Sequence, residues 1–315
     1  MSPTQPALAI HGGAGTIPVA ALDPVTANAH HRALRAALAA GWAILAKNGA
    51  ALDAVTASVM ALEDDPLFNA GHGAVFTASG TLEMDAAIME GATRQAGAVA
   101  GICGPKNPIL AARAVMEHSG NVLLTGGGAL EFLRAQGLEL MPEAYFTTQR
   151  RLDALHLELA RRASGAPDTR SDADRHGTVG AVARDVFGNL AAGTSTGGFT
   201  AKRPGRVGDT PVIGAGTFAD NATCAVSTTG TGEVFIRFTA AAEISARIRH
   251  AGQTLDAAAS AVIAELLSHG GDGGLIAIGP EGPPVLPFNS KGMYRGFVTA
   301  GGVMHTAIHQ EPYRS

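Results

Sequence analysis

The chain has 315 residues, of which 46% are hydrophobic and 16% charged, and its formal net charge is −4. A chain of this length can bury about three quarters of its unfolded surface, and the balance of 23 basic and 27 acidic residues argues against a nucleic-acid partner. With only Cys103 and Cys224, the sequence does not support a disulfide scaffold or a thiolate zinc site.

The N-terminal segment, Met-Ser-Pro-Thr-Gln-Pro, has no basic region ahead of an apolar run. No apolar stretch in the sequence reaches the roughly 18 residues that a membrane helix needs. We therefore expect a soluble, cytoplasmic protein that has no membrane partner.

In the first half of the chain, apolar residues recur alternately at strand and helix spacing. A short strand over 7–10 leads into a glycine-rich run at 11–15, and Asn48-Gly49 is a typical helix stop. Helices are expected over 25–47, 51–63, 108–118 and 129–136, and strands over 7–10, 73–77, 82–89, 96–103 and 121–124.

The second half begins with a helix over 152–159, followed by a polar segment at 164–175 whose composition predicts a disordered linker. Strands are then expected over 178–185, 190–196, 222–229, 275–278 and 297–303, with helices over 233–250 and 255–267. Clustered strands with separate helix pairs favour an α+β layered fold. Because strands follow the linker at once, we expect one domain over 1–315.

Thr178 stands at the junction between the polar segment and a strand, directly after Gly177. A threonine hydroxyl alone is a poor nucleophile, but an adjacent α-amino group with a pKa of about 7.7–8 can accept its proton near neutral pH. Cutting the Gly177–Thr178 bond would place both groups on one residue. The alternative interpretation is an ordinary strand start.

The hairpin after Thr178 predicts a partner for its hydroxyl. Gly188 suits the left-handed position of a three-residue loop at 186–188, and this loop pairs Asp185 with Asn189. The same register places Thr178 opposite Thr196, with Cβ atoms about 5 Å apart. A second hydroxyl can orient and polarise the first, although opposed threonines also simply stabilise sheets.

A strand-to-helix turn at Thr229-Gly230-Thr-Gly-Glu233 is a candidate site for negative charge. Backbone N–H groups at helix N-termini stabilise anions. The Thr229 hydroxyl and the Gly230 N–H can therefore hold the oxyanion of a tetrahedral intermediate. The alternative is a plain turn without a ligand.

Arg206 and Asp209 lie three residues apart in a loop stiffened by glycine and proline. The guanidinium fork fits a carboxylate, and the aspartate can accept hydrogen bonds from an ammonium. Together they can grip the charged ends of an amino acid. Taken alone, such a pair is more often a solvated surface ion pair.

The glycine-rich run after the first strand, Ile10-His-Gly-Gly-Ala-Gly15, raises a different class of function. A strand, a glycine loop and a helix can bind phosphate, so a phosphate- or nucleotide-binding protein is a remote alternative. The run lacks the complete G-x-G-x-x-G spacing and a Walker lysine.

Together, these motifs closely resemble the plant-type (type III) asparaginase / isoaspartyl aminopeptidase family of N-terminal-nucleophile hydrolases. The resemblance covers nearly the whole chain in order. The matching segments are His11-Gly-Gly-Ala-Gly15, Pro66-Leu-Phe-Asn-Ala-Gly71, Gly97-Ala-Val-Ala-Gly101, Gly177-Thr-Val-Gly-Ala-Val-Ala183, Gly193-Thr-Ser-Thr-Gly-Gly198, Pro204-Gly-Arg-Val-Gly-Asp209, Gly214-Ala-Gly216 and Thr229-Gly-Thr-Gly-Glu233.

The resemblance implies a four-layer αββα sandwich and a precursor that cuts its own Gly177–Thr178 bond. The products would be an α subunit, 1–177, ending in a flexible linker at about 160–177, and a β subunit, 178–315. By resemblance, Thr178 is the nucleophile, Thr196 is its hydroxyl neighbour, and Asn69 lies near the nucleophile. Thr229 and Gly230 form the oxyanion site. The substrate is bound by Arg206, by Asp209 and by the main chain of Gly230 and Gly232.

The family also has a sodium-binding loop with main-chain carbonyl ligands. Here these match Leu62, Glu63, Asp65, Phe68, Ala70 and His72. Read from the residues alone, the acidic side chains of Glu63, Asp64 and Asp65 suggest a calcium site instead. We expect a structural sodium ion and no organic cofactor, and we leave activation by potassium open.

The activity implied by the resemblance is hydrolysis of L-asparagine to L-aspartate and ammonia, and cleavage of β-aspartyl dipeptides, through a threonyl β-aspartyl intermediate. The nearest alternative is a glycosylasparaginase that acts on N-glycans. The segment 197–204 resembles the plant-type asparaginases more than the glycosylasparaginases. A homodimer of cleaved αβ units is the expected assembly.

Overall fold

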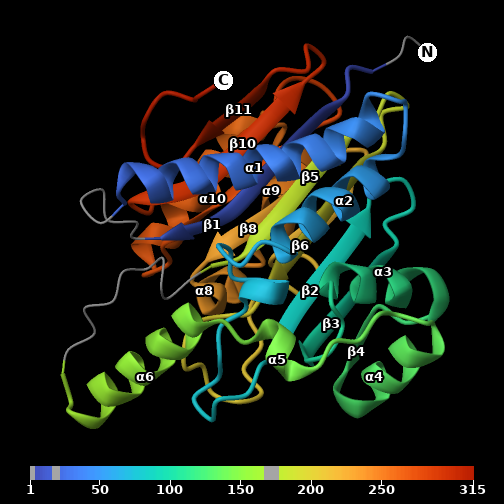
Figure 1. Ribbon diagram of the computed structural model, residues 1–315. Coiled ribbons are helices and arrows are strands. Elements are labelled where there is room, and N and C mark those ends of the chain that lie inside the picture. The colour runs from blue at the N-terminus through green and yellow to red at the C-terminus, as the bar shows by residue number, and fades with distance from the viewer. Residues whose placement is uncertain (1–3, 16–21, 167–176) are drawn as a thin grey trace.

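The structure is a computed structural model that describes residues 4–15, 22–166 and 177–315 (Figure 1). Two β-sheets lie face to face, and helices cover the outer face of each. The predicted four-layer αββα sandwich is confirmed. In the described residues no helix combines the length and apolar character needed to cross a membrane.

The larger sheet has eight strands in the order β11-β10-β1-β5-β6-β2-β3-β4. Neighbouring strands are antiparallel except β3 and β4, which run parallel. Their bounds are β1 Ala7–Gly15, β2 Met84–Glu90, β3 Ala96–Ile102, β4 Leu123–Thr125, β5 Val179–Arg184, β6 Leu190–Thr196, β10 Gly292–Thr299 and β11 Met304–Ala307. Residues before and after the Gly177–Thr178 bond thus share one sheet.

The smaller sheet is antiparallel and has the order β7-β8-β9. Its strands are β7 Thr217–Asp220, β8 Cys224–Gly230 and β9 Gly273–Ile278. It packs on the middle of the larger sheet, where β8 and β9 contact β1 and β5, and β8 also contacts β6.

Helices α1, α2 and α3 cover the outer face of the larger sheet, and α9 and α10 cover the smaller one (Figure 1). Helix α6 projects from the body at the lower left of the view, just before residues 167–176. The helices are α1 Pro24–Leu45, α2 Ala51–Glu63, α3 Pro108–His118, α4 Gly126–Ala135, α5 Glu143–Phe146, α6 Gln149–Ala163, α8 Gly232–Arg237, α9 Ala240–Ala251 and α10 Leu255–Ser268.

Side-chain alternation along the strands separates two buried layers. Leu8 and Ile10 of β1 belong to the core under α1 and α2, whereas Ala7 and Ala9 belong to the core between the sheets. Small residues such as these alanines let the two sheets approach closely. The middle of the larger sheet is therefore buried on both faces, and polar groups there must find hydrogen-bond partners within the protein.

Most predicted elements agree with the structure, and helices 51–63 and 108–118 match to the residue. The predicted strand over 73–77 is wrong: Gly71–Gly73 is a 3₁₀ turn, and Phe76 and Thr77 form only isolated bridges. The sequence also missed β7, β11 and α5. Most of the predicted linker, 164–175, lies outside the described residues.

The predicted single helix over 233–250 is also wrong, because it divides into α8 and α9. Thr239 between them has a left-handed backbone (φ 45°, ψ 47°) that interrupts the helix. A threonine in this conformation gives no sequence signal of a break, since glycine or asparagine is the usual residue there. The helix that follows the Thr229 turn is therefore the short α8, which ends at Arg237.

Candidate active site

The β5–β6 hairpin brings the two predicted threonines together. Gly188 has φ 83°, and the Asp185 N–H donates to the Asn189 carbonyl over 3.1 Å. The strands pair in the predicted register, so the hydroxyl of Thr178 donates to that of Thr196 over 3.2 Å. Both side chains are almost completely buried. The register prediction is confirmed.

The carbonyl of Gly177 lies between two donors. The Thr196 hydroxyl and the Asn69 side-chain N–H each donate to it over 2.8 Å. Asn69 is itself fixed, because its Nδ2 also donates to the Gly198 carbonyl (2.6 Å) and its Oδ1 accepts from the Val75 N–H (3.0 Å). Two fixed donors on one carbonyl oxygen stabilise negative charge that develops there.

Strand β1 passes directly beside the Gly177–Thr178 bond. A Cβ on Gly13, whose φ is 109°, would lie 3.2 Å from Cα of Gly177 and 3.3 Å from N of Thr178. Only glycine allows this backbone and this approach. The next N–H, that of Ala14, donates to the Thr229 hydroxyl over 3.2 Å. β1 therefore connects Thr229 to the neighbourhood of Thr178.

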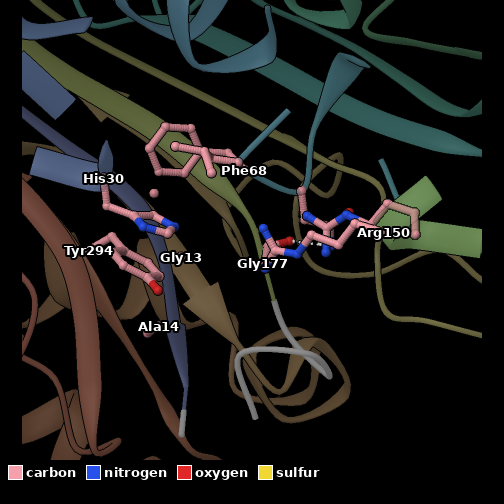
Figure 2. Close-up of a pocket in the computed structure, with 11 residues that line it drawn as sticks. Gly13, Ala14, His30, Phe68, Arg150, Gly177 and Tyr294 are labelled. Carbon is pink, nitrogen blue, oxygen red and sulfur yellow. Dashed lines mark hydrogen bonds between the residues drawn. The ribbon is translucent and has the colours of Figure 1, made fainter. Parts of the chain in front are cut away.

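A small pocket opens on the same peptide. Figure 2 shows His30, Phe68 and Tyr294 on one side of it and Gly177 with Arg150 on the other. The His30 and Tyr294 rings stack with centroids 4.3 Å apart. Burial lowers the pKa of His30, so its ring is neutral near pH 7. The pocket combines an aromatic wall with the cationic side chain of Arg150.

Gly230 ends β8 with φ 150° and pairs with Gly273 of β9. A Cβ at Gly230 would lie 2.2 Å from the Asp272 carbonyl oxygen, so a side chain does not fit. The next N–H, that of Thr231, donates to the same carbonyl, and α8 begins one residue later. The predicted strand-to-helix turn is present where the sequence placed it.

Asp209 is buried in the loop between β6 and β7. Its Oδ2 accepts a 2.7 Å hydrogen bond from the Thr228 hydroxyl, and burial raises its pKa to about 6. A Cβ on Gly232 would lie 2.7 Å from Asp209 Oδ1 and 2.9 Å from Arg206 Nη2. The structure thus brings together Arg206, Asp209 and Gly232, as the resemblance implies.

Arg206 already has a carboxylate partner that sequence reasoning missed. Its Nε and Nη2 donate to the two oxygens of Glu233 over 2.9 and 2.8 Å, and its guanidinium lies 4.8 Å above the Phe199 ring. The Glu233 side chain is 55% exposed, whereas that of Arg206 is 15% exposed. A planar fork held at the surface in this way is suited to exchanging one carboxylate for another.

The sequence reading also gave no role to His11, Ser227 and Thr228. His11 contacts the Thr178 carbonyl and the Ser227 hydroxyl, each over 2.9 Å, and Thr228 holds Asp209. One signal was available: Ser227, Thr228 and Thr229 are three successive hydroxyl residues inside a strand that is otherwise apolar and buried. Such residues need partners, and the site supplies them.

The end of α2 leaves main-chain carbonyls available for a cation. Pro66 has no N–H to give to the Leu62 carbonyl, and the Leu67 N–H donates to Asp65 Oδ1 over 3.0 Å. The carbonyls of Asp65 and Ala70 each accept one backbone N–H, which leaves a lone pair on each. His72 stacks on Tyr145, so its ring takes another role.

The acidic side chains of the same loop diverge. Glu63 is fully buried and accepts from the Ile109 N–H (2.9 Å), Asp64 accepts from Asn107 (3.0 Å), and Asp65 caps its own turn. Across the described ranges, no three His, Cys, Asp or Glu side chains gather to hold a metal. The calcium site built from acidic side chains therefore has no support. The loop is better suited to a cation that is held by main-chain carbonyls.

The glycine-rich run at 11–15 is part of β1, buried between β10 and β5. Helix α1 begins only at Pro24, where Asp23 caps it. The run therefore does not form a loop at a helix N-terminus, which a phosphate site would need. This placement removes the basis of the nucleotide-binding alternative.

The architecture is that of the αββα N-terminal-nucleophile hydrolases that the sequence resembles. The family model described as asparaginase matches residues 4–308. An isoaspartyl peptidase of Salmonella typhimurium is 49% identical, covering 96% of this chain and 98% of the relative, and one of Escherichia coli is 49% identical, covering 96% of each. A Homo sapiens isoaspartyl peptidase/L-asparaginase is 40% identical over 92% of each. The chain belongs to the asparaginase family.

Proposed function

We propose that the protein cuts itself between Gly177 and Thr178 and then hydrolyses L-asparagine and β-aspartyl dipeptides. The observation that carries this proposal is the Gly177 carbonyl, which accepts from Asn69 and Thr196 while the Thr178 hydroxyl donates to Thr196. Nucleophile and electrophile of the first step therefore share one set of hydrogen bonds.

In the processing step, the Thr178 hydroxyl oxygen attacks the carbonyl carbon of Gly177. The carbon–nitrogen bond breaks, the acyl group moves from nitrogen to oxygen, and Thr178 gains a free amine. Water then hydrolyses the ester and leaves a carboxylate on Gly177. Asn69 and Thr196 stabilise the charge on the carbonyl oxygen during the attack.

In turnover, the same hydroxyl attacks the side-chain carbonyl of the substrate. The α-amine of Thr178 takes its proton and passes it to the leaving ammonia or amino acid. Water then hydrolyses the β-aspartyl ester. The Thr229 hydroxyl and the Gly230 N–H hold the oxyanion, and a donor of this kind contributes about 3 kcal/mol.

Recognition of the substrate uses the opposite charges of Asp209 and Arg206. Asp209 binds the α-ammonium and Arg206 the α-carboxylate, with main-chain groups of Gly230 and Gly232 assisting. In this scheme the substrate carboxylate competes with Glu233 for the guanidinium. Because Gly232 has no side chain, Asp209 and Arg206 can both lie against its backbone.

The names of the relatives support this choice of substrates. All three proteins compared above are named as isoaspartyl peptidases, and the human one also as an L-asparaginase. These names favour our proposal over a glycosylasparaginase, which acts on N-glycosyl asparagine.

We further propose a bound metal ion, an assembly and a cellular location for the enzyme. The carbonyls of Leu62, Glu63, Asp65, Phe68, Ala70 and His72 would hold a sodium ion, whose effect would be to fix the loop that carries Asn69. The working unit would be a homodimer of cleaved αβ units, and its location would be cytoplasmic.

Intact-mass measurement of the purified protein with a denaturing gel tests the proposal. We expect two fragments, residues 1–177 and 178–315, and release of aspartate from a β-aspartyl dipeptide. An uncut chain that does not hydrolyse the dipeptide would contradict the proposal. Turnover of an N-glycosyl asparagine in preference to the dipeptide would instead support the glycan amidase.

A further inference from the structure

A buried chain of side chains leads away from the candidate nucleophile and takes no part in the mechanism above. It consists of His11 on β1, Thr194 on β6, Ser227 on β8 and Thr217 on β7, which we call the hydroxyl chain of His11. All four side chains have no solvent exposure. Polar groups buried this deeply reduce stability unless their hydrogen bonds are complete, so their arrangement needs a reason.

The direction of every hydrogen bond in this chain follows from its first contact. His11 Nδ1 lies 2.9 Å from the Thr178 carbonyl, which can only accept, so Nδ1 carries the proton. Burial lowers the His11 pKa to about 3, so the ring is neutral and Nε2 is an acceptor. The Ser227 hydroxyl, 2.9 Å away, must donate to Nε2.

The shortest remaining contacts then have consistent directions, and two backbone carbonyls lie further away, Gly216 at 3.3 Å from Thr194 and Thr210 at 3.1 Å from Thr217. The Ser227 proton is used, so the 2.7 Å contact between Ser227 and Thr194 requires Thr194 to donate. The Thr194 proton is used in turn, so Thr217 donates to Thr194 over 2.7 Å. Three hydroxyls in sequence therefore present a donor to His11 Nε2, which holds the ring in the orientation that points its Nδ1 proton at Thr178.

A glycine makes this arrangement possible. Gly180 pairs with His11 on one side and with Thr194 on the other, so the three residues form one row across β1, β5 and β6. A Cβ at Gly180 would lie 2.0 Å from Ser227 Oγ and 2.5 Å from His11 Nε2. The gap at Gly180 is thus the space through which Ser227 of the other sheet reaches His11.

We infer that His11 is a positioning residue, whose Nδ1–H fixes the carbonyl of Thr178 and whose ring is held at Nε2 by the chain of Ser227, Thr194 and Thr217. The inference rests on the proposed function. After cleavage, Thr178 is attached to the protein only through its carbonyl side, because the bond to Gly177 is gone. A hydrogen bond to that carbonyl then orients the hydroxyl and the amine that perform the chemistry.

Ser227→Ala tests the inference without touching Thr178 or the substrate. It removes the donor to Nε2, so Nε2 becomes an unpaired buried acceptor, the ring is held at Nδ1 alone, and the hydrogen bond to the Thr178 carbonyl loosens. We expect kcat for a β-aspartyl dipeptide to fall about 10- to 100-fold, with KM changed less than about twofold, because misplacement of a reacting group by about 1 Å costs rate rather than binding.

Ser245→Ala is the matched control. Ser245 and Thr223 form a buried hydroxyl pair at 2.7 Å that has no connection to His11. The two variants should lower the melting temperature by similar amounts, but Ser245→Ala should keep the kcat of the wild type. Equal kcat values for the two variants would overturn the inference. A loss confined to KM would do the same.

Thr194 provides a second pair if Ser227→Ala fails to fold. Thr194→Ser keeps the hydroxyl and should keep most of kcat, whereas Thr194→Val removes it at nearly constant size and should behave like Ser227→Ala. If both Thr194 variants lose kcat to the same extent, the hydroxyl is not what matters and the inference fails.

The tautomer itself can be observed apart from activity. Long-range ¹H–¹⁵N spectra of the wild type, with His11 assigned by comparison with His11→Asn, should show a neutral ring protonated at Nδ1. Ser227→Ala should shift the ¹⁵N resonance of Nε2, because that nitrogen loses its hydrogen bond, and Ser245→Ala should leave it unchanged. A wild-type ring protonated at Nε2 would exclude the inference, whereas a wild type that hydrolyses no β-aspartyl substrate would contradict only the proposed function.

Discussion

The two ends of the candidate site are built differently. At the reaction end, Thr178, Thr196 and Thr229 are neutral hydroxyls in or directly beside strands, buried between two sheets, and each is hydrogen-bonded to other parts of the site. At the recognition end, Arg206 and Asp209 are charged groups on a loop, and Arg206 is paired with an exposed glutamate.

The difference shows how one site can combine catalytic groups that are held rigidly with an arginine that can exchange one carboxylate partner for another. Groups on paired strands are held in place before substrate arrives, which is the condition for stabilising charge that develops during a reaction. A surface carboxylate on an arginine can be replaced by a substrate carboxylate at little cost. Substitutions at the reaction end should therefore affect rates, and those at the recognition end should affect binding.

Thr178→Ala should have the largest effect. It removes the hydroxyl proposed to attack the Gly177 carbonyl, so we expect no self-cleavage and no hydrolysis. Thr178→Ser keeps a hydroxyl in the same place and should cut and turn over more slowly than the wild type. Denaturing gels followed over days and a β-aspartyl dipeptide assay measure both effects. A fully active Thr178→Ala protein would end the case for a threonine nucleophile.

Thr196→Val should come next. The side chain keeps its size but no longer donates to the Gly177 carbonyl or accepts from Thr178, so self-cleavage should slow about 100- to 1,000-fold, the usual cost of one oxyanion donor. The rate of fragment appearance by mass spectrometry measures this. Thr223→Val, which changes another buried threonine away from the site, should cut at the normal rate. Equal rates in the two variants would show that the Thr196 contact is only structural.

Asp209→Asn should have a smaller effect, and on binding. Loss of a hydrogen bond from a charged partner costs about 1.5–3 kcal/mol, so kcat/KM should fall about 10- to 100-fold, mainly through KM. If kcat fell while KM stayed constant, Asp209 would belong to the reaction end instead.

The pH dependence sharpens the same test. The Asp209 pKa is raised to about 6, so kcat/KM of the cleaved enzyme should fall as pH drops through about 6 and the carboxylate is neutralised. The fall in kcat/KM near pH 6 should disappear in Asp209→Asn, whereas the pH dependence that arises from the Thr178 amine should remain. The linked stability has the opposite sign: because the pKa is raised above 3.8, this contribution is complete below pH 3.8 and lost as pH rises through about 6.

The sequence predicted the reaction end well because strand geometry is regular. A three-residue loop ending at Gly188 determines the pairing of every residue in β5 and β6, so Thr178 and Thr196 could be matched by counting. His11 could not be matched in this way, because its partners Thr178 and Ser227 come from another strand and from the other sheet. Contacts between sheets depend on how the layers are stacked, which no local pattern specifies.

The recognition end could be predicted only by type of residue. The spacing of Arg206 and Asp209 indicated a charged pair, but the Glu233 carboxylate reaches Arg206 from α8, which the sequence read as part of a longer helix. The break at Thr239 depends on a left-handed threonine that the surrounding structure imposes. Loop geometry of this kind follows from tertiary packing and not from propensity.

Gly188→Ala should have the smallest effect and test whether the turn or the strand pairing maintains the register. At φ 83° an alanine costs about 1 kcal/mol, and its Cβ would lie 3.3 Å from the Thr4 hydroxyl. For a chain of this size the melting temperature should fall by about 2 °C. Gly301→Ala, at a position with open space, is the control and should leave the melting temperature unchanged.

Because β5 and β6 are each also paired with a second strand of the sheet, the register should survive this strain, and kcat should stay within about twofold of the wild type. Calorimetry and the dipeptide assay measure the two quantities on one preparation. A large fall in kcat with a small fall in melting temperature would mean that the turn, rather than the flanking strands, keeps Thr178 opposite Thr196. The reaction end would then be less rigid than its burial implies.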